Sequence, residues 1–256
     1  MLFAVKSYLK FLLRSTNEHG VHSPFVFDLV TKCLYDTTNY PQYEVLQKHR
    51  EALLGDTSAI SMRDLGAGSQ VFTSQNRRIA DIARKAGISS RRAKMLFRLT
   101  HYFQSQRTLE LGTSLGLATC ALSMGNKAGT VVTVEGCAET AAVAQRYLTG
   151  AGAGNVRVEV NSFERFLENV SDHFDLIFFD GNHRREATLR YFEALLPTAH
   201  NDSVWIFDDI HWSAEMEAAW EQIKKHPRVR ITIDTFQWGF VFFRSEQVSE
   251  HFTIRV

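Results

Sequence analysis

The sequence predicts an α/β protein whose core is a mostly parallel β-sheet with helices on both faces. From residue 107 onward, short runs of apolar and β-branched residues alternate with segments of helical periodicity. Runs that are apolar throughout are typical of parallel strands buried on both faces. The first run leads through a turn bounded by Gly112 and Gly116 into a helix. Such a turn places backbone N–H groups at the edge where open α/β sheets bind ligands.

The composition is that of an ordinary globular protein. The chain has 256 residues, of which 45% are hydrophobic and 22% charged, enough for one large α/β domain and a smaller appendage. The net charge of +1 gives no whole-protein electrostatic case for nucleic acid or for an anionic membrane. Three cysteines without metal-type spacing favour a reduced, cytoplasmic setting. No run is long and apolar enough to span a bilayer.

Residues 1–88 are predicted to form an N-terminal helical region that serves as a substrate or lid region. Apolar residues recur at helical spacing from Leu2 to Arg14, and we expect this amphipathic helix to pack against the rest of the protein rather than lie on a membrane. Ser23-Pro24 is a typical helix start. His19 and His22 have no evident third ligand, so a structural or lid role is favoured over a metal site. Further helices are predicted at 25–35, 41–54, 76–85 and 90–103.

Residues 89–256 are predicted to form the main domain. Its strands are expected at 108–111, 130–135, 156–160, 174–180, 203–207, 230–234 and 239–244, with helices between the first six. The last two strands are joined only by the short turn Thr235 to Trp238, so they form a hairpin and the last strand runs antiparallel.

The order of these elements carries a family resemblance. Glu110, Gly112 and Gly116 have the spacing Glu-x-Gly-x-x-x-Gly, whereas the Gly-x-Gly-x-x-Gly dinucleotide fingerprint is absent. The carboxylate of Glu110 suggests a cationic or hydroxylated partner. With the strand and helix order from Ser90 to Val256, this motif resembles class I S-adenosylmethionine-dependent methyltransferases. The resemblance implies a Rossmann-like sheet of seven strands with an antiparallel last strand, and S-adenosylmethionine as the cofactor.

A second glycine stretch, Asp64 to Ser69 (DLGAGS), also resembles the methyltransferase glycine motif. The residues before it make a poor buried strand, and no second strand with a terminal acid follows at the right distance. We therefore expect a structural or substrate-side role here rather than cofactor binding.

The cofactor residues are expected at the ends of the first four strands. Glu135 ends the second strand, where a carboxylate can accept hydrogen bonds from both ribose hydroxyls. After the third strand, Asn161 and Ser162 fall where the resembling family contacts adenine. Phe163 could stack on the base or be a core residue of the helix that it begins. The complete predicted set is Glu110, Gly112, Thr113, Gly116, Glu135, Gly136, Asn161, Ser162, Phe163 and Asp180.

Three carboxylates mark the next two strand ends. Asp180 ends the fourth strand, and Asp208 and Asp209 end the fifth. Like charges at one sheet edge repel each other unless a cation lies among them, and divalent cations prefer oxygen ligands. The alternative is that these acids cap the helices that follow. We expect Asp180, Asp208 and Asp209 to hold Mg²⁺ or another divalent cation.

This arrangement resembles metal-dependent O-methyltransferases of the catechol O-methyltransferase type and of bacterial natural-product and sugar pathways. In that type, Asp180 and Asp208 match metal ligands, and the third ligand is usually Asn where this chain has Asp209. His183 falls where that type carries its lysine base, and a histidine can also accept a proton from a hydroxyl. Asp180 and His183 are therefore the predicted catalytic residues, and His211 is a second candidate base.

The sequence thus predicts an enzyme that transfers methyl from S-adenosylmethionine to a hydroxyl of a small molecule with the help of a divalent metal. Alternatives are a metal-independent RNA or protein methyltransferase and a non-catalytic cofactor-binding protein. Membrane and nucleic-acid partners are not expected, and a homodimer remains open. The identity of the acceptor does not follow from the sequence.

Overall fold

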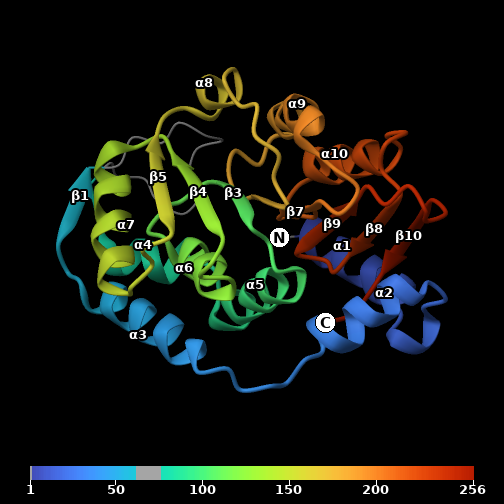
Figure 1. Ribbon diagram of the computed structural model, residues 1–256, viewed down its shortest axis with the longest axis horizontal. Helices are drawn as coiled ribbons and strands as arrows, with labels where there is room; N and C mark the ends of the chain where they lie inside the picture. The colour runs from blue at the N-terminus through green and yellow to red at the C-terminus, as the bar shows by residue number, and fades with distance from the viewer. Residues whose placement is uncertain (1, 62–75) are drawn as a thin grey trace. The chain divides into compact units, whose positions relative to one another are not determined.

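The computed structural model describes residues 2–61 and 76–256 (Figure 1). The chain divides into two compact units. The central unit is formed by residues 36–166, and the terminal unit joins the chain up to residue 35 with residues 167–256. The expected division of the sequence at residue 88 stays a prediction. The DLGAGS stretch lies outside the described residues.

The central unit contains three parallel strands, β3 (Arg107–Leu111), β4 (Thr130–Glu135) and β5 (Val156–Val160), in the order β3-β4-β5. Helix α6 (Leu117–Gly125) connects β3 to β4, and α7 (Ala138–Gly150) connects β4 to β5. β3 and β4 are apolar because both of their faces are covered, as the sequence predicted.

Further helices of this unit pack around that three-stranded core. Helix α3 (Gln42–Gly55) contacts α5 (Ser90–Phe103), α6 and α7, and Ser89 caps α5 by accepting a hydrogen bond from the N–H of Arg92. The helix predicted from residue 76 begins later, as α4 (Ile79–Lys85). Residues 76–78 instead form β2 (Asn76–Arg78), which pairs antiparallel with β1 (Ala59–Ser61). Residues 76–78 are therefore extended in spite of their helical periodicity, because they pair with β1.

The terminal unit contains five strands in the order β10-β8-β9-β7-β6. β6 (Leu176–Phe179) and β7 (Val204–Asp208) are parallel, whereas β9 (Trp238–Phe242) runs antiparallel to both β7 and β8 (Ile231–Asp234). The predicted antiparallel hairpin strand is therefore confirmed. β10 (Glu250–Thr253) adds a parallel edge strand beyond β8 that the sequence did not reveal.

The described residues thus contribute eight strands to a mixed, mostly parallel sheet, and the predicted α/β class is confirmed. The terminal unit also contains the helices α9 (Arg185–Leu195) and α10 (Ala214–Lys224). Its core is rich in aromatic residues, among them Trp205, Trp220 and Trp238, which are fully buried. Gly239 permits the close approach of Trp220, because a Cβ at this position would lie 2.7 Å from the indole ring. No disulfide joins the three buried cysteines.

The N-terminal segment also belongs to the terminal unit. It comprises α1 (Leu2–Arg14), a 3₁₀ turn (Glu18–Gly20), α2 (Pro24–Leu29) and a π-helical turn (Val30–Leu34). The predicted start of the second helix is confirmed, since Ser23 Oγ accepts a hydrogen bond from the N–H of Val26. His19 and His22 are exposed. Among the described helices, none is long and apolar enough to cross a membrane.

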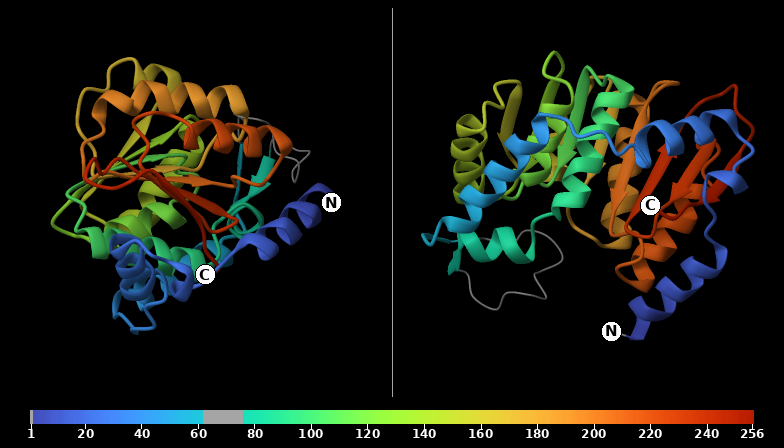
Figure 2. Two further views of the ribbon diagram at one scale, coloured as in Figure 1. Left: turned by 90° about the vertical axis from the view of Figure 1, so that its right-hand side faces the viewer. Right: turned by 90° about the horizontal axis from the view of Figure 1, so that it is seen from below.

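Helix α1 presents its apolar stripe outward, which corrects the expectation that the stripe packs against the protein. Ser7 and Phe11, on the opposite side of the helix, are the buried residues. The ring of Phe11 lies 5.5 Å from the ring of Phe236, measured between centroids, and Tyr8 lies 4.9 Å from it. Phe11 thus holds the helix by its buried side, whereas Tyr8 is 46% exposed and lies at the edge of the outward stripe. In both views of Figure 2, α1 (dark blue) projects outward from the strands of its unit.

Candidate functional site

The glycine turn after β3 is tied to the neighbouring strand. The N–H groups of Gly112 and Thr113 donate to the carbonyl of Val134 at 3.1 and 3.3 Å. Gly112 and Gly116 have φ angles of 113° and 80°, which favour glycine, and Gly116 is the N-cap of α6. The predicted turn from strand to helix N-terminus is therefore confirmed in its geometry.

Glu135 lies beside this turn at the end of β4. Its Oε2 accepts a hydrogen bond from the N–H of Ser114 at 2.9 Å, and its Oε1 accepts one from the N–H of Cys137 at 3.0 Å. Ser114 has φ 48°, a strained conformation for a residue other than glycine. The carboxylate thus holds a strained loop against the start of α7. Sequence reasoning missed Ser114, because only the folded loop reveals its N–H direction.

The end of β5 adjoins Glu135. Val160 is the register partner of Glu135, and the N–H of Asn161 donates to the backbone carbonyl of Glu135 at 3.1 Å. Ser162 Oγ accepts a hydrogen bond from the N–H of Arg165 and so caps α8 (Phe163–Leu167). The central unit therefore holds nine of the predicted cofactor residues: Glu110, Gly112, Thr113, Gly116, Glu135, Gly136, Asn161, Ser162 and Phe163. Asp180 belongs to the terminal unit, and its cofactor role stays a prediction.

Glu110 is fully buried beneath the glycine turn. Its Oε2 accepts hydrogen bonds from the hydroxyls of Thr119 at 2.5 Å and Thr133 at 2.6 Å, and Thr113 Oγ1 lies 2.6 Å from Thr133 Oγ1. Its Oε1 has no hydrogen-bond partner among residues 2–61 and 76–256. Burial raises the pKa of Glu110 to about 8, helped by the charge of Glu135 and opposed by the two hydroxyl hydrogen bonds. The hydroxylated partners expected for Glu110 thus include threonines of this chain.

The acidic strand ends of the terminal unit are neighbours, as predicted. β6 and β7 pair in parallel with Phe179 opposite Phe207, so Asp180 and Asp208 follow at the same edge. Asp208 is buried, and its Oδ1 accepts a hydrogen bond from the N–H of Asp209 at 2.8 Å. His183 Nε2 lies 3.9 Å from Asp180 Oδ1.

These acids do not form a metal centre in the arrangement described. Within residues 2–61 and 76–256, no group of three or more His, Cys, Asp or Glu side chains could hold a metal ion. Two local features account for this. One carboxylate oxygen of Asp208 accepts a hydrogen bond from the backbone N–H of Asp209. Asp209 itself has φ 54°, which turns the chain away from the direction of β7. Metal binding by Asp180, Asp208 and Asp209 therefore stays a prediction.

His211 is held between two carboxylates of the terminal unit. Its Nδ1 lies 2.8 Å from Glu217 Oε1, and its Nε2 lies 2.8 Å from Asp234 Oδ2. Burial lowers the pKa of His211, but the hydrogen bonds and charges of Asp234 and Glu217 outweigh burial, so the pKa is raised. An imidazole that donates to two carboxylates has no lone pair for a substrate proton. Its role as a second candidate base stays a prediction, and these two contacts do not favour it.

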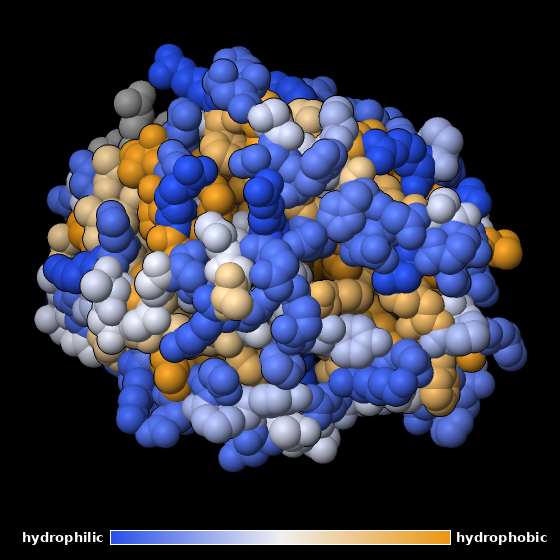
Figure 3. Space-filling view, viewed as in Figure 1, coloured by the Kyte–Doolittle hydropathy of each residue, from blue (hydrophilic) through white to orange (hydrophobic). Residues whose placement is uncertain are grey.

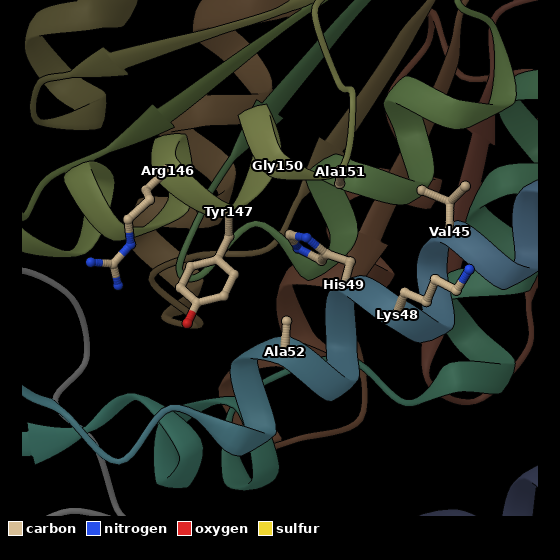
Figure 4. A pocket seen from close by; sticks show the side chains of 8 residues that line it. All are labelled: Val45, Lys48, His49, Ala52, Arg146, Tyr147, Gly150 and Ala151. Atoms are coloured by element: carbon tan, nitrogen blue, oxygen red, sulfur yellow. The ribbon is translucent and has the colours of Figure 1, made fainter.

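A separate cavity of about 620 Å³ lies between α3 and α7 of the central unit (Figure 4). None of the predicted site residues is among the eight that line it. His49 at its wall is buried, and neither ring nitrogen has a hydrogen-bond partner. Burial lowers the pKa of His49, with the backbones of Gly116 and Tyr147 opposing. No sequence motif indicates this cavity, because α3 and α7, which form its walls, are far apart along the chain.

Comparison with known proteins connects this geometry to a family. The profile of a methyltransferase-domain family matches residues 109–210, which run from β3 to just beyond β7 and include the glycine turn, Glu135 and the acidic strand ends. This part of the chain is therefore similar to a methyltransferase domain. No curated protein matches it in sequence.

Solved methyltransferase structures share the fold of this chain. An S-adenosylhomocysteine-bound methyltransferase of Podospora anserina is 15% identical, with a TM-score of 0.63 over 87% of this chain and 97% of its own. An O-methyltransferase described as putative, from Klebsiella pneumoniae, is 19% identical, with 0.57 over 82% and 92%. An O-methyltransferase of Streptomyces achromogenes, involved in tomaymycin synthesis and bound to S-adenosylmethionine, is 20% identical, with 0.52 over 84% and 94%.

Proposed function

We propose that the protein is an S-adenosylmethionine-dependent O-methyltransferase that acts on a hydroxyl of a small molecule. The observation that carries the proposal is the position of Glu135, whose carboxylate lies at the end of β4 and is hydrogen-bonded to the glycine turn. A nucleoside offers two adjacent ribose hydroxyls, and a carboxylate at this edge is the acceptor that they require.

The surrounding residues suit the remaining parts of the cofactor. Gly116 caps α6 without a side-chain hydrogen bond, which leaves the first N–H groups of the helix as candidate donors to the carboxylate of the methionine moiety. Asn161 and Phe163 follow β5 next to Glu135, where they can bind and stack on adenine. When bound, the cofactor supplies an activated methyl group. The chain has to bind both reactants, orient them and accept a proton from the hydroxyl.

His183 is the residue that we propose as the proton acceptor, with Asp180 as its partner. The carboxylate of Asp180 lies within ion-pair distance of the imidazole, with 3.9 Å between Asp180 Oδ1 and His183 Nε2. His183 is partly exposed, so a substrate hydroxyl can reach it. We derive no step through a metal ion, because the three acids do not form a ligand group among the described residues.

The activity is tested by incubating the purified protein with methyl-labelled S-adenosylmethionine and a panel of phenols, catechols and sugars. We expect label in an ether product and the release of S-adenosylhomocysteine, and we expect His183→Gln to lower kcat at least tenfold with little change in cofactor affinity. Absence of cofactor binding at millimolar concentration would overturn the proposal.

Metal dependence is tested by thermal unfolding in EDTA, Mg²⁺ or Ca²⁺. Because the acids do not gather around one point, we expect no shift of the wild-type midpoint at millimolar cation. A specific ion at a hundredfold excess over its dissociation constant would instead stabilise the fold by about 2.7 kcal/mol. If Mg²⁺ raises the midpoint and Asp208→Asn abolishes that gain, the metal-dependent mechanism is the right one.

A further inference from the structure

Helix α1 carries the most concentrated exposed apolar surface in the described part of the chain. Nine large hydrophobic side chains are exposed there, and five of them belong to α1. These five are Val5, Tyr8, Leu9, Leu12 and Leu13, and Leu13 is 88% exposed. By contrast, hydrophilic residues predominate on the molecular face seen in Figure 3. Burying apolar side chains is favourable, so a face of this kind marks an interaction site.

The charges of α1 have one sign. Lys6, Lys10 and Arg14 are its only charged side chains, and all are exposed. None of them forms an ion pair with any described residue. Elsewhere in the chain, Lys32 pairs with Asp28, Lys48 with Glu44 and Lys224 with Glu221. The apolar stripe of α1 is therefore bordered by cations that have no counter-charge in the part of the chain that the structure describes.

The terminal unit fixes this orientation. Ser7 and Phe11 are buried, and Phe11 contacts Phe236. Directly after the helix, the N–H of Thr16 donates to the carbonyl of Thr253, and the N–H of Arg255 donates to the carbonyl of Thr16. These bonds attach the end of α1 to β10. Contacts on its other side thus keep the apolar stripe outward.

We propose that α1 binds the surface of an anionic lipid membrane and so attaches the protein peripherally to it. An apolar stripe bordered by lysine and arginine is what the boundary between acyl chains and anionic headgroups accommodates. Each lysine or arginine near such a surface contributes about 1 kcal/mol, roughly a fivefold gain in binding. The inference rests on α1 alone and does not depend on the proposed methyl transfer.

A second copy of the chain is the less suitable occupant. If two α1 helices packed stripe to stripe about a twofold axis, three cations from each copy would meet, and like charges disfavour such contact. One exposed helix face is also small beside the roughly 800 Å² per partner of a stable interface. Anionic lipid supplies the missing counter-charge and needs no shape complementarity.

The test is co-sedimentation of the full-length protein with vesicles of phosphatidylcholine alone or with about 30% phosphatidylglycerol, at about 0.1 M salt. We expect binding only to the anionic vesicles. Leu9→Gln/Leu13→Gln and Lys6→Gln/Lys10→Gln should each lower the partition coefficient at least tenfold. Val248→Gln is the matched control, since Val248 is 83% exposed but lies outside α1.

Thermal melts establish that each variant folds, and light scattering reports its mass without lipid. The proposal is overturned if the wild-type protein does not bind anionic vesicles, or if the α1 variants bind these vesicles as well as Val248→Gln does. It is also overturned if the leucine variant converts a wild-type dimer into a monomer, because the stripe is then a contact between copies. Methyl transfer in solution is measured separately and should be unchanged in these variants.

Discussion

Replacing Glu110 with Gln is expected to make the protein more stable at pH 8. The carboxyl is fully buried, its pKa is raised to about 8, and its Oε1 has no partner. In the unfolded chain the same group ionises near its ordinary pKa of 4.5. The folded state therefore holds a proton that the unfolded state releases, and wild-type stability falls as the pH rises from about 4.5 to about 8.

The amide introduced by Glu110→Gln would keep an acceptor for Thr119 and Thr133 without this ionisation. Each unit of pKa shift is worth about 1.4 kcal/mol, so we expect the variant to gain on the order of 2–4 kcal/mol over wild type at pH 8 and almost nothing at pH 4. Urea unfolding at a series of pH values measures the difference. Parallel pH profiles for the two proteins would show that Glu110 is not the buried acid described above.

Replacing His211 with Leu is expected to cost on the order of 2–4 kcal/mol of stability near pH 6. The imidazole bridges Glu217 on α10 and Asp234 at the end of β8, and its removal leaves two partly buried carboxylates without their cation. We expect a smaller loss of stability than for a fully buried ion pair, because Glu217 is 26% exposed and solvent screens its charge.

The pH dependence of this effect has a definite sign. The pKa of His211 is raised in the folded state, so its contribution is complete below the unfolded value of about 6.5 and declines as the pH rises through the folded value. The cost of His211→Leu should therefore shrink above neutral pH. His183→Leu, which removes a histidine held by only one distant carboxylate, is the control. A cost that is the same at pH 6 and pH 9 would contradict the charged bridge.

The sequence predicts the cofactor edge well because its determinants are local or lie on adjacent parallel strands. The turn from Gly112 to Gly116 follows β3 directly. Glu135 and Asn161 follow β4 and β5, whose parallel register places their ends together. Strand periodicity and turn chemistry therefore suffice to bring these residues to one edge.

The features that the sequence did not reveal depend on long-range packing. Helical periodicity identifies the apolar stripe of α1, but only Phe236 decides which side of the helix is buried. The partners of His211 come from α10 and β8, so no local motif announces them. β10 is mostly polar and buries only Phe252, so its pattern does not stand out. The sequence places three acids at two strand ends but does not fix the direction of their side chains, and no group of three metal-binding side chains is found among the described residues. The metal centre stays a prediction.

Calorimetric titration with S-adenosylhomocysteine tests the proposed cofactor site most directly. The proteins to compare are wild type, Glu135→Ala and the control Glu159→Gln, whose residue lies on β5 and whose carboxylate pairs with Arg157. We expect wild type and Glu159→Gln to bind equally, and Glu135→Ala to lose roughly 1–3 kcal/mol of binding through its charge-assisted hydrogen bonds. Equal affinity for Glu135→Ala, in a variant that melts like wild type, would contradict cofactor binding at the end of β4.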